Sequence, residues 1–318
     1  MLLAMNLLLL DKTKAAYLGL AVGDALGATV EFMTPNEIKL THTVHKNITG
    51  GGWLRLKPGR VTDDTEMSLA LGNALLSSNK VEATSIAEAF SEWMRSKPVD
   101  IGNTVRRGIM YYRKQGKISV PKEDFNAGNG ACMRSLPIAI ATLGCDQDSV
   151  IAASRIQSHI THHSDISDAG TEHIIELIQM ALAHCTMNEM EQYSYAFVDK
   201  NPQYRFNIKK INNPSGFIVE TLQVVLQSFY STDDFESCLI NVVNRGGDAD
   251  TTGAIAGMLA GAYYGMDCIP KRWLNKLNQQ VMQQCLTQAE ELLALAPIRI
   301  ATLPDDCPHS QNTNELIV

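Results

Sequence analysis

The sequence has no C-x-x-C pair, no excess of basic residues and no apolar run long enough to cross a bilayer. Its seven cysteines are scattered along 318 residues, which is typical of reduced thiols and excludes a zinc site built on cysteine pairs. Lys and Arg total 27 against 34 for Asp and Glu, which gives a net charge of −7. This acidic balance disfavours nucleic acids and anionic membranes as partners, because both bind to positive surfaces.

The N-terminal residues 1–10 form an apolar run that is too short for a membrane span of about twenty residues. The run also lacks the basic region and the small-residue cleavage site of a signal peptide. No Pro/Ser-rich linker and no internal repeat divides the rest of the chain. We therefore expect a cytoplasmic monomer with one domain over residues 11–300 and terminal segments at 1–10 and 301–318.

Apolar residues recur at helical spacing along most of the chain. Met67, Leu71, Ala74 and Leu75, for example, lie at i, i+4, i+7 and i+8. The alternating pattern of β-strands is nearly absent. The sequence thus predicts a single compact all-α domain of about ten helices, with loops near 33–62, 114–130 and 199–215. The expected helices cover residues 13–30, 65–78, 83–95, 131–143, 148–158, 168–185, 216–230, 234–243, 250–264 and 271–295.

Three stretches place carboxylates and small residues at the ends of expected helices. Gly19, Gly23 and Gly27 clear one helix face for close packing ahead of one of these carboxylates. The two stretches that begin helices, at 62–64 and 248–251, also fit helix capping, as Asp63 with Glu66 three residues later does. The side chains concerned are Glu31, Thr62, Asp63, Asp64, Asp248, Asp250 and Thr251.

A metal site is the alternative to capping. Five converging carboxylates raise one another's pKa and require cations to stay ionised. Ligands that are all oxygen, without paired His or Cys, favour Mg²⁺ or Mn²⁺ over zinc. Spacing alone leaves both interpretations open. His159, His162 and His163 are similarly open, because they fit either a metal or acid–base role or a polar loop with one functional member.

The order of these motifs resembles the ADP-ribosylglycohydrolase family from about residue 13 to 266. The segments that carry the resemblance are Gly-Asp-Ala-Leu-Gly at 23–27, Thr-Asp-Asp-Thr at 62–65 and Gly-Gly-Asp-Ala-Asp-Thr at 246–251, with similar segments at 93–108, 128–134, 158–163 and 215–221. The resemblance implies an all-α fold with a binuclear metal cleft. It also implies hydrolysis of the N-glycosidic bond between ADP-ribose and an arginine side chain.

The resemblance also implies a role for each matching residue. Two Mn²⁺ or Mg²⁺ ions would be held by Thr62, Asp63, Asp64, Asp248, Asp250 and Thr251. Glu31 and Asp100 would be catalytic, with Glu31 holding a water and Asp100 contacting the departing guanidinium. Substrate would be bound by Gly128, Asn129, Gly130, Met133, Arg134, His162 and Phe217. The loop 128–134 would cradle the diphosphate, and Phe217 replaces an expected tyrosine, so it has no hydroxyl to offer.

Residues 50–59 and 235–239 are most similar to the bacterial branch of the family that acts on dinitrogenase reductase, the nitrogenase iron protein. This likeness implies an ADP-ribosylated protein as partner, with that iron protein as the target and ADP-ribose as the product. The alternatives are a hydrolase for another ADP-ribose linkage or for toxin-modified proteins, and an inactive member that only binds ADP-ribose. The intact Thr-Asp-Asp and Asp-x-Asp-Thr motifs argue against an inactive member.

Overall fold

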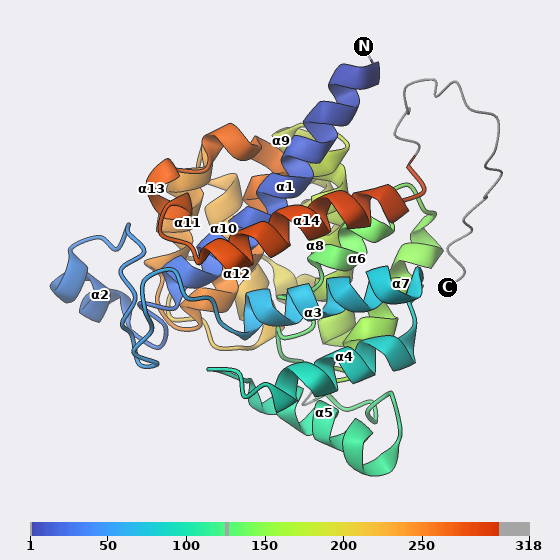
Figure 1. The fold of residues 1–318 in the computed structure, drawn as a ribbon. Coiled ribbons are helices and arrows are strands. Elements are labelled where there is room, and N and C mark those ends of the chain that lie inside the picture. Colours follow the sequence, from blue (N-terminus) through green and yellow to red (C-terminus); the bar gives the residue numbers. More distant parts are fainter. Residues whose placement is uncertain (1, 125–126, 299–318) are drawn as a thin grey trace.

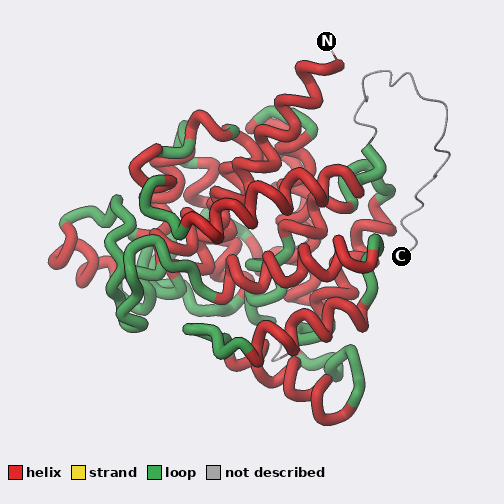
Figure 2. Tube along the Cα trace, viewed as in Figure 1, coloured by secondary structure: helices red, strands yellow, loops and turns green. Residues whose placement is uncertain are grey.

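The computed structural model describes residues 2–124 and 127–298, so the expected terminal segment 301–318 lies outside the described residues. Within them all regular structure is helical apart from two isolated bridges (Figure 2), which confirms the all-α class. The helices are α1 (Leu2–Gly27), α2 (Pro35–His42), α3 (Asp63–Ser78), α4 (Ala83–Arg95), α5 (Asn103–Gln115), α6 (Leu136–Ala141), α7 (Gln147–Ser158), α8 (Asp165–Leu182), α9 (Met187–Lys200), α10 (Ile218–Tyr230), α11 (Phe235–Val243), α12 (Ala249–Tyr264), α13 (Lys271–Leu274) and α14 (Gln279–Leu295), with short 3₁₀ turns η2 (Pro202–Tyr204) and η3 (Met266–Cys268).

Several expected boundaries are wrong. α2, α5 and α9 have no counterpart in the sequence prediction, and α2 lies inside the expected loop 33–62. The expected helix 131–143 shrinks to α6, because residues 129–135 form tight turns in which the Asn129 carbonyl accepts from two backbone N–H groups. The expected helix 271–295 divides into α13 and α14, since Asn278 caps the start of α14. α1 begins at Leu2, so residues 2–10 continue into the first helix of the domain.

α1 and α12 form the centre of the fold and pack against each other more extensively than any other pair of helices (Figure 1). Their backbones touch, because a Cβ at Gly23 would lie 1.9 Å from the carbonyl oxygen of Gly253, and one at Gly257 would lie 2.0 Å from that of Gly19. The glycine face predicted from spacing is therefore confirmed as a packing face. Gly19 contacts Gly257 and Gly23 contacts Gly253, so residue numbers rise along α1 as they fall along α12. The two helices are therefore antiparallel, and the end of α1 meets the start of α12.

The other helices surround this pair. α14 packs along α1 and α3, α11 and α10 pack on α12, and α4 lies against α3 with α5 beyond it (Figure 1). Residues 15–27 of α1 and 249–262 of α12 are all buried, whereas Leu7 and Leu8 near the start of α1 are exposed. The contact between the two helices thus fixes where the end of α1 meets the start of α12.

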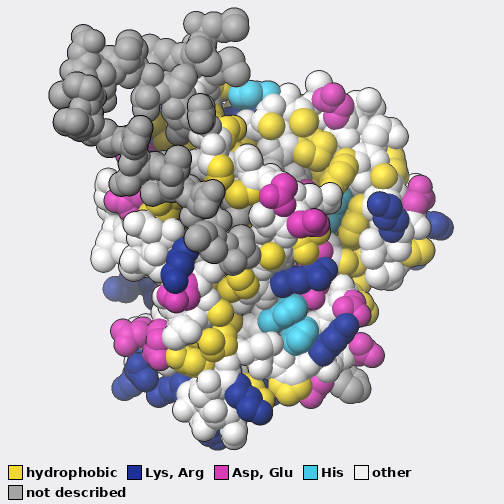
Figure 3. All heavy atoms as spheres, turned by 90° about the vertical axis from the view of Figure 1, so that its right-hand side faces the viewer, with side chains coloured by type: hydrophobic (Ala, Val, Ile, Leu, Met, Phe, Trp, Pro, Cys, Tyr) yellow, Lys and Arg dark blue, Asp and Glu magenta, His cyan; other side chains and the backbone are white. Residues whose placement is uncertain are grey.

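The surface carries charges of both signs. On the face drawn in Figure 3, acidic and basic side chains are interspersed. Six cysteines fall within the described residues, and all six are free thiols, as the sequence predicts for them. None of the helices described here combines the length and apolar character of a membrane span.

Candidate active site

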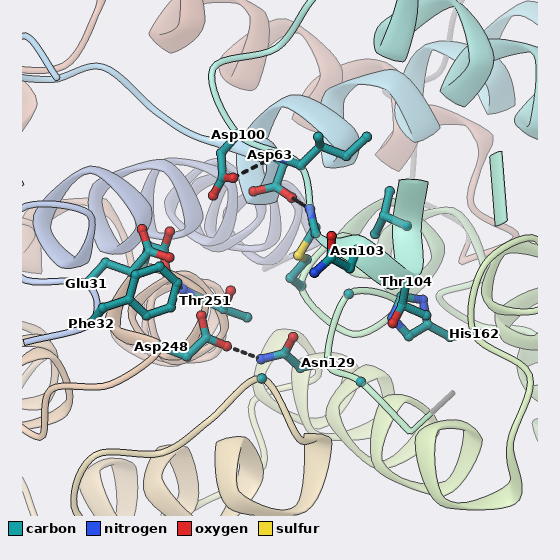
Figure 4. Close-up of a pocket in the computed structure, with 18 of the residues that line it drawn as sticks. Glu31, Phe32, Asp63, Asp100, Asn103, Thr104, Asn129, His162, Asp248 and Thr251 are labelled. Atoms are coloured by element: carbon teal, nitrogen blue, oxygen red, sulfur yellow. Dashed lines mark hydrogen bonds between the residues drawn. The ribbon is translucent and has the colours of Figure 1, made fainter. Parts of the chain in front are cut away.

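A pocket of about 480 Å³ opens where α1 ends and α3 and α12 begin. Five other segments complete it, at residues 53, 100–105, 128–133, 162 and 216. In Figure 4, Glu31, Asp248 and Thr251 lie on one side, with Asn129 and His162 across from them. We call Glu31, Asp63, Asp100, Asp248 and Asp250 the acidic wall, and Gly128, Asn129, Gly130, Met133 and His162 the neutral wall.

Backbone contacts bring the first part of the acidic wall together. Gly246 and Gly247 both have positive φ, of 69° and 65°, which glycine adopts without a steric penalty. The turn they form lets the Phe32 N–H donate to the Gly247 carbonyl at 2.7 Å and the Gly247 N–H donate to the Met33 carbonyl at 3.0 Å. The chain just after Glu31 is therefore tied to the chain just before Asp248.

A buried carboxylate in the last turns of α1 sets the start of α3. Asp24 accepts from the backbone N–H groups of Thr62 and Thr65 at 3.0 and 3.2 Å and from the hydroxyls of both threonines. Burial raises its pKa to about 6, against these four hydrogen bonds, which lower it. Asp24 thus holds the segment that presents Asp63 and Asp64.

The capping interpretation is wrong at both helix starts. The N-cap of α3 is Thr62, and it makes no side-chain cap, because its hydroxyl bonds to Asp24 instead. Asp63 accepts from the Gly102 N–H at 3.2 Å. Asp248 is the N-cap of α12, yet its carboxylate accepts from Asn129 Nδ2 at 2.6 Å rather than from its own helix. These carboxylates are not used to start helices.

Burial raises the pKa of every carboxylate in the acidic wall, and repulsion from neighbouring carboxylates adds to this for all of them except Asp100. Burial lifts the pKa of Glu31 to about 7, with the charges of Asp248 and Asp100 adding to the effect and a hydrogen bond from Trp53 opposing it. The pKa values of Asp63 and Asp250 lie well above the ordinary range for the same two reasons. Perturbed carboxylates gathered in a cleft are typical of functional sites.

The donor set fits a hard divalent cation. One carboxylate oxygen each from Glu31, Asp100 and Asp250 lie within 4.8 Å of one another. Behind the pocket, Asp64 is fully buried and its Oδ1 has no hydrogen-bond partner among the described residues. An ionised carboxylate with an unpaired buried oxygen is costly unless a cation neutralises it. The arrangement therefore suits Mg²⁺ or Mn²⁺ ligation by oxygens.

The neutral wall offers uncharged donors and space. The Asn129 side chain bridges to Asp248 and to the Thr221 hydroxyl, at 2.6 and 2.9 Å. A Cβ at Gly130 would lie 2.7 Å from Cε1 of His162, so this loop approaches the imidazole as only glycine can. His162 is 2% exposed, and burial holds its pKa well below the usual range, so the ring is neutral at pH 7.

Comparison with known proteins agrees with this geometry. The sequence model of the ADP-ribosylglycohydrolases matches residues 5–302. The chain belongs to the ADP-ribosylglycohydrolase family. It is 48% identical to an ADP-ribosyl-[dinitrogen reductase] glycohydrolase of Rhodospirillum rubrum over 90% of this chain and 97% of that protein.

Two further relatives of this glycohydrolase family bear on the chain. An ADP-ribosylarginine hydrolase of Serratia proteamaculans is 32% identical, with 91% of this chain and 80% of that protein covered. A solved structure described as an ADP-ribosylglycohydrolase-related protein complex superposes with a TM-score of 0.81 at 31% identity, covering 91% of this chain and 99% of that one. The family fold is therefore shown over nearly the whole domain.

Most residues to which the family resemblance gives a role lie at the pocket. Those that line it are Glu31, Asp63, Asp100, Gly128, Asn129, Gly130, Met133, His162, Asp248, Asp250 and Thr251. Thr62 and Asp64 are fully buried behind it. Phe217 is 39% exposed and follows the lining residue Gly216 without lining the pocket itself. The division of these residues into ligands and catalytic groups stays a prediction.

The side chain of Arg134 does not enter the pocket. It is fully buried, stacks on the Phe90 ring at 4.4 Å and donates to Gln157 and Thr161. A guanidinium enclosed in this way cannot reach a diphosphate in the pocket. The expected contact of Arg134 with substrate through the backbone of the loop 128–134 stays a prediction.

The sequence analysis gave no role to several residues that line the pocket or support it. Trp53 donates its indole N–H to Oε2 of Glu31 at 2.6 Å, and its ring lies 5.4 Å from that of Phe32. The signal for Trp53 was its place after three glycines, and the signal for Asp24 was a carboxylate within an otherwise apolar helix. Asn103 and Thr104 also line the pocket, and no pattern in the sequence singles them out.

His159 and His163 do not join His162 at the pocket. Their rings stack at 3.7 Å. His159 pairs with Asp168, and His163 bonds to the Val120 carbonyl. The polar loop with one member at the pocket is therefore the correct interpretation of the three histidines.

Proposed function

We propose that this chain is an ADP-ribosylarginine hydrolase that uses two Mn²⁺ or Mg²⁺ ions and removes ADP-ribose from an arginine of a target protein. The proposed target is dinitrogenase reductase, and hydrolysis would reverse its inactivation. The 48% identity to the Rhodospirillum rubrum protein supports dinitrogenase reductase as the target. The likeness to the ADP-ribosylarginine hydrolase of Serratia proteamaculans supports the arginine linkage.

The observation that carries the proposal is the approach of Asp100 to Glu31 and Asp250 within one pocket. N-linked ADP-ribosylarginine carries a positive guanidinium next to the scissile bond. Carboxylates pair with guanidinium groups through strong charge-assisted hydrogen bonds. An O-glycosidic linkage to serine has no such charge, so a half-buried aspartate at this position favours the arginine linkage.

Asp63, Asp64, Asp248 and Asp250, together with Thr62 and Thr251, supply the oxygens that would hold the ions. The bound ions would supply a Lewis acid that polarises ribose hydroxyls and makes a water more acidic. Oε1 of Glu31 is left to accept a proton from the attacking water, because Oε2 already accepts from Trp53. As the bond from C1 to the guanidine nitrogen breaks, the carboxylates of the acidic wall stabilise the positive charge on the sugar.

The Asp100 carboxylate pairs with the arginine guanidinium and steers it as it leaves the sugar. Its Oδ1 accepts from the Ile101 N–H at 2.7 Å, so Oδ2 is the oxygen left for the guanidinium. The leaving guanidine takes up the proton that Glu31 removes from the attacking water. Water adds OH to C1, the nitrogen gains H, and the net charge of the reactants equals that of the products.

The test is release of ADP-ribose from arginine-modified dinitrogenase reductase, with a second arginine-modified protein and a serine-linked substrate alongside. We expect metal-dependent release from the arginine substrates only, reduced more than about 100-fold by chelator or by Asp100→Asn. Release from the serine substrate would favour another linkage. Binding of ADP-ribose without release from any substrate would indicate an inactive binding member. Asp165→Asn is the control, since Asp165 lies on the surface paired with Lys122.

A further inference from the structure

Arg134 is linked through Thr161 to His162, which lines the pocket. Nη2 of Arg134 donates to Oγ1 of Thr161 at 2.8 Å, and the same Oγ1 lies 2.7 Å from Nδ1 of His162. The guanidinium is fixed by further bonds from Nε and Nη2 to the side chain and carbonyl of Gln157, at 2.9 and 3.0 Å. A buried cation is thus joined to a pocket imidazole by one hydroxyl.

The direction of each hydrogen bond in this chain follows from the atoms. A guanidinium can only donate, so Oγ1 of Thr161 accepts from Arg134. Thr161 is 1% exposed, and the described residues offer its hydroxyl hydrogen no acceptor other than Nδ1 of His162. If Nδ1 carried the proton instead, a buried hydroxyl would be left without an acceptor, which is unfavourable. Nδ1 therefore accepts, and the proton of the neutral ring sits on Nε2.

The Nε2 edge of His162 lies beside the two glycines of the neutral wall, 3.0 and 3.1 Å from where a Cβ of Gly128 or Gly130 would be. No described residue supplies a hydrogen-bond partner for Nε2, and His162 lines the pocket. Burial and the positive charges of Arg134 and Arg107 keep the pKa of His162 low, which makes a doubly protonated ring unfavourable.

We propose that Arg134 is a positioning residue that acts through Thr161 to fix the tautomer of His162, so that Nε2–H is the donor offered to an oxygen of ADP-ribose. The ligand part of this proposal rests on the proposed function, whereas the tautomer part does not. The acceptor is a phosphate or ribose oxygen, since both offer lone pairs to a neutral N–H. His162 then binds and orients the ligand without moving a proton during hydrolysis.

The first test measures the tautomer in the protein without ligand. Uniform ¹⁵N labelling of histidine and loading with diamagnetic Mg²⁺ give imidazole spectra, and His162→Leu assigns the signals of residue 162. We expect Nδ1 of His162 to be unprotonated and Nε2 to carry the hydrogen. A proton on Nδ1 would overturn the proposal, whatever substrate the enzyme takes.

The second test measures the dissociation constant for free ADP-ribose by calorimetry on the Mg²⁺-loaded protein. Thr161→Val removes the hydroxyl at nearly constant volume, and we expect about fivefold weaker binding with a mixture of tautomers. Thr161→Ser keeps the hydroxyl and should bind within about twofold of the wild type. Equal affinity and an unchanged tautomer in Thr161→Val would contradict the proposal.

A double-mutant cycle separates positioning from general damage. If Thr161 acts through His162, adding Thr161→Val to His162→Leu causes no further loss of ADP-ribose affinity. A full additional fivefold loss in the double variant would assign Thr161 a merely structural role. Melting temperatures and Mg²⁺ affinities of the variants serve as controls for folding. Failure of wild-type protein to bind ADP-ribose would sink the proposed function, while the tautomer measurement would still decide this proposal.

Discussion

The acidic wall and the neutral wall face each other across one pocket but are built in opposite ways. The acidic wall gathers five carboxylates whose pKa values are raised by burial and, except for Asp100, by one another. The neutral wall holds glycine backbone, an amide and an uncharged imidazole. Ionised carboxylates packed this closely repel one another unless cations bind, whereas the neutral wall carries no charge and offers N–H donors to an anion.

The two walls also depend on different parts of the fold. The acidic wall is set by the antiparallel contact of α1 with α12 and by Asp24, which ties α3 to α1. The neutral wall is set by loops that hydrogen bonds hold together, such as the Asn129 N–H with the Gly216 carbonyl. The difference predicts that changes in one wall alter metal affinity and changes in the other alter ADP-ribose affinity.

Asp250→Asn should have the largest effect. Removing one of three close carboxylate oxygens costs metal affinity, and we expect hydrolysis to fall more than about 100-fold. In the metal-free protein at pH 8 the same change removes repulsion, so we expect the melting temperature to rise by about 2 °C or more. Calorimetry with Mn²⁺ and thermal scans measure both effects.

The matched control for Asp250→Asn is Asp165→Asn, which removes one exposed charge far from the pocket. It should change neither metal affinity nor the melting temperature noticeably, as for most surface ion pairs. If Asp250→Asn kept normal Mn²⁺ affinity, the acidic wall would not be a cation site.

The metal-free protein should lose stability as the pH rises. The pKa values of Glu31 and Asp24 are about 7 and about 6 in the folded protein, above those of the unfolded chain, so the folded state binds more protons between about pH 4 and 7. The free energy of unfolding therefore falls across this range and does not recover above it. Mn²⁺ should raise the melting temperature more at pH 8 than at pH 5.

Thermal scans with and without Mn²⁺ at both pH values measure this effect. A stabilisation by Mn²⁺ that is equal at pH 5 and pH 8 would argue against carboxylates as the ligands. Asp250→Asn provides the internal comparison, because it should show a weaker dependence on pH.

Gly130→Ala changes the neutral wall and should weaken ADP-ribose binding without weakening Mn²⁺ binding. Its Cβ would press on His162, and because the ring cannot move without losing its bond to Thr161, we expect ADP-ribose to bind about tenfold more weakly. Mn²⁺ affinity should stay within about twofold of the wild type. Calorimetry with each ligand gives the two numbers, and equal losses of both would show that the walls are not independent.

Trp53→Phe should have the smallest effect, a fall in kcat of about threefold to tenfold. The change keeps an aromatic ring beside Phe32 and removes only the N–H that holds Oε2 of Glu31. Trp93→Phe is the matched control, since Trp93 donates the same kind of bond to Glu66 away from this pocket. A similar fall in both variants would assign Trp53 no specific role.

The sequence predicted the α-helical class and most helices, because apolar periodicity reports which face is buried. α4 lies at its expected bounds, and α3 and α12 differ by one or two residues. Two helices that the sequence analysis did not predict could have been found from their first residues. α2 and α9 both begin with a capping box, at Thr34 with Glu37 and at Thr186 with Glu189. α5 has no such cap, and its start was not visible in the sequence.

The motifs predicted which residues gather at the pocket but not which contacts hold them there. Asp24 and Trp53 act on other site residues through bonds between segments 22 to 41 residues apart, which no local pattern reports. Arg134 shows another limit, because its place in the loop 128–134 did not reveal that its side chain turns into the core. Local spacing identifies loops, while the direction of a side chain depends on the packed fold.

The most direct measurement is a crystal structure with Mn²⁺ and ADP-ribose, in which anomalous scattering locates the manganese. The account predicts manganese peaks at the carboxylates of the acidic wall and Asp64, with the diphosphate against Gly128 and Gly130 and an ADP-ribose oxygen at Nε2 of His162. Manganese outside the acidic wall, or a diphosphate lying against those carboxylates, would contradict the division of the pocket into two walls.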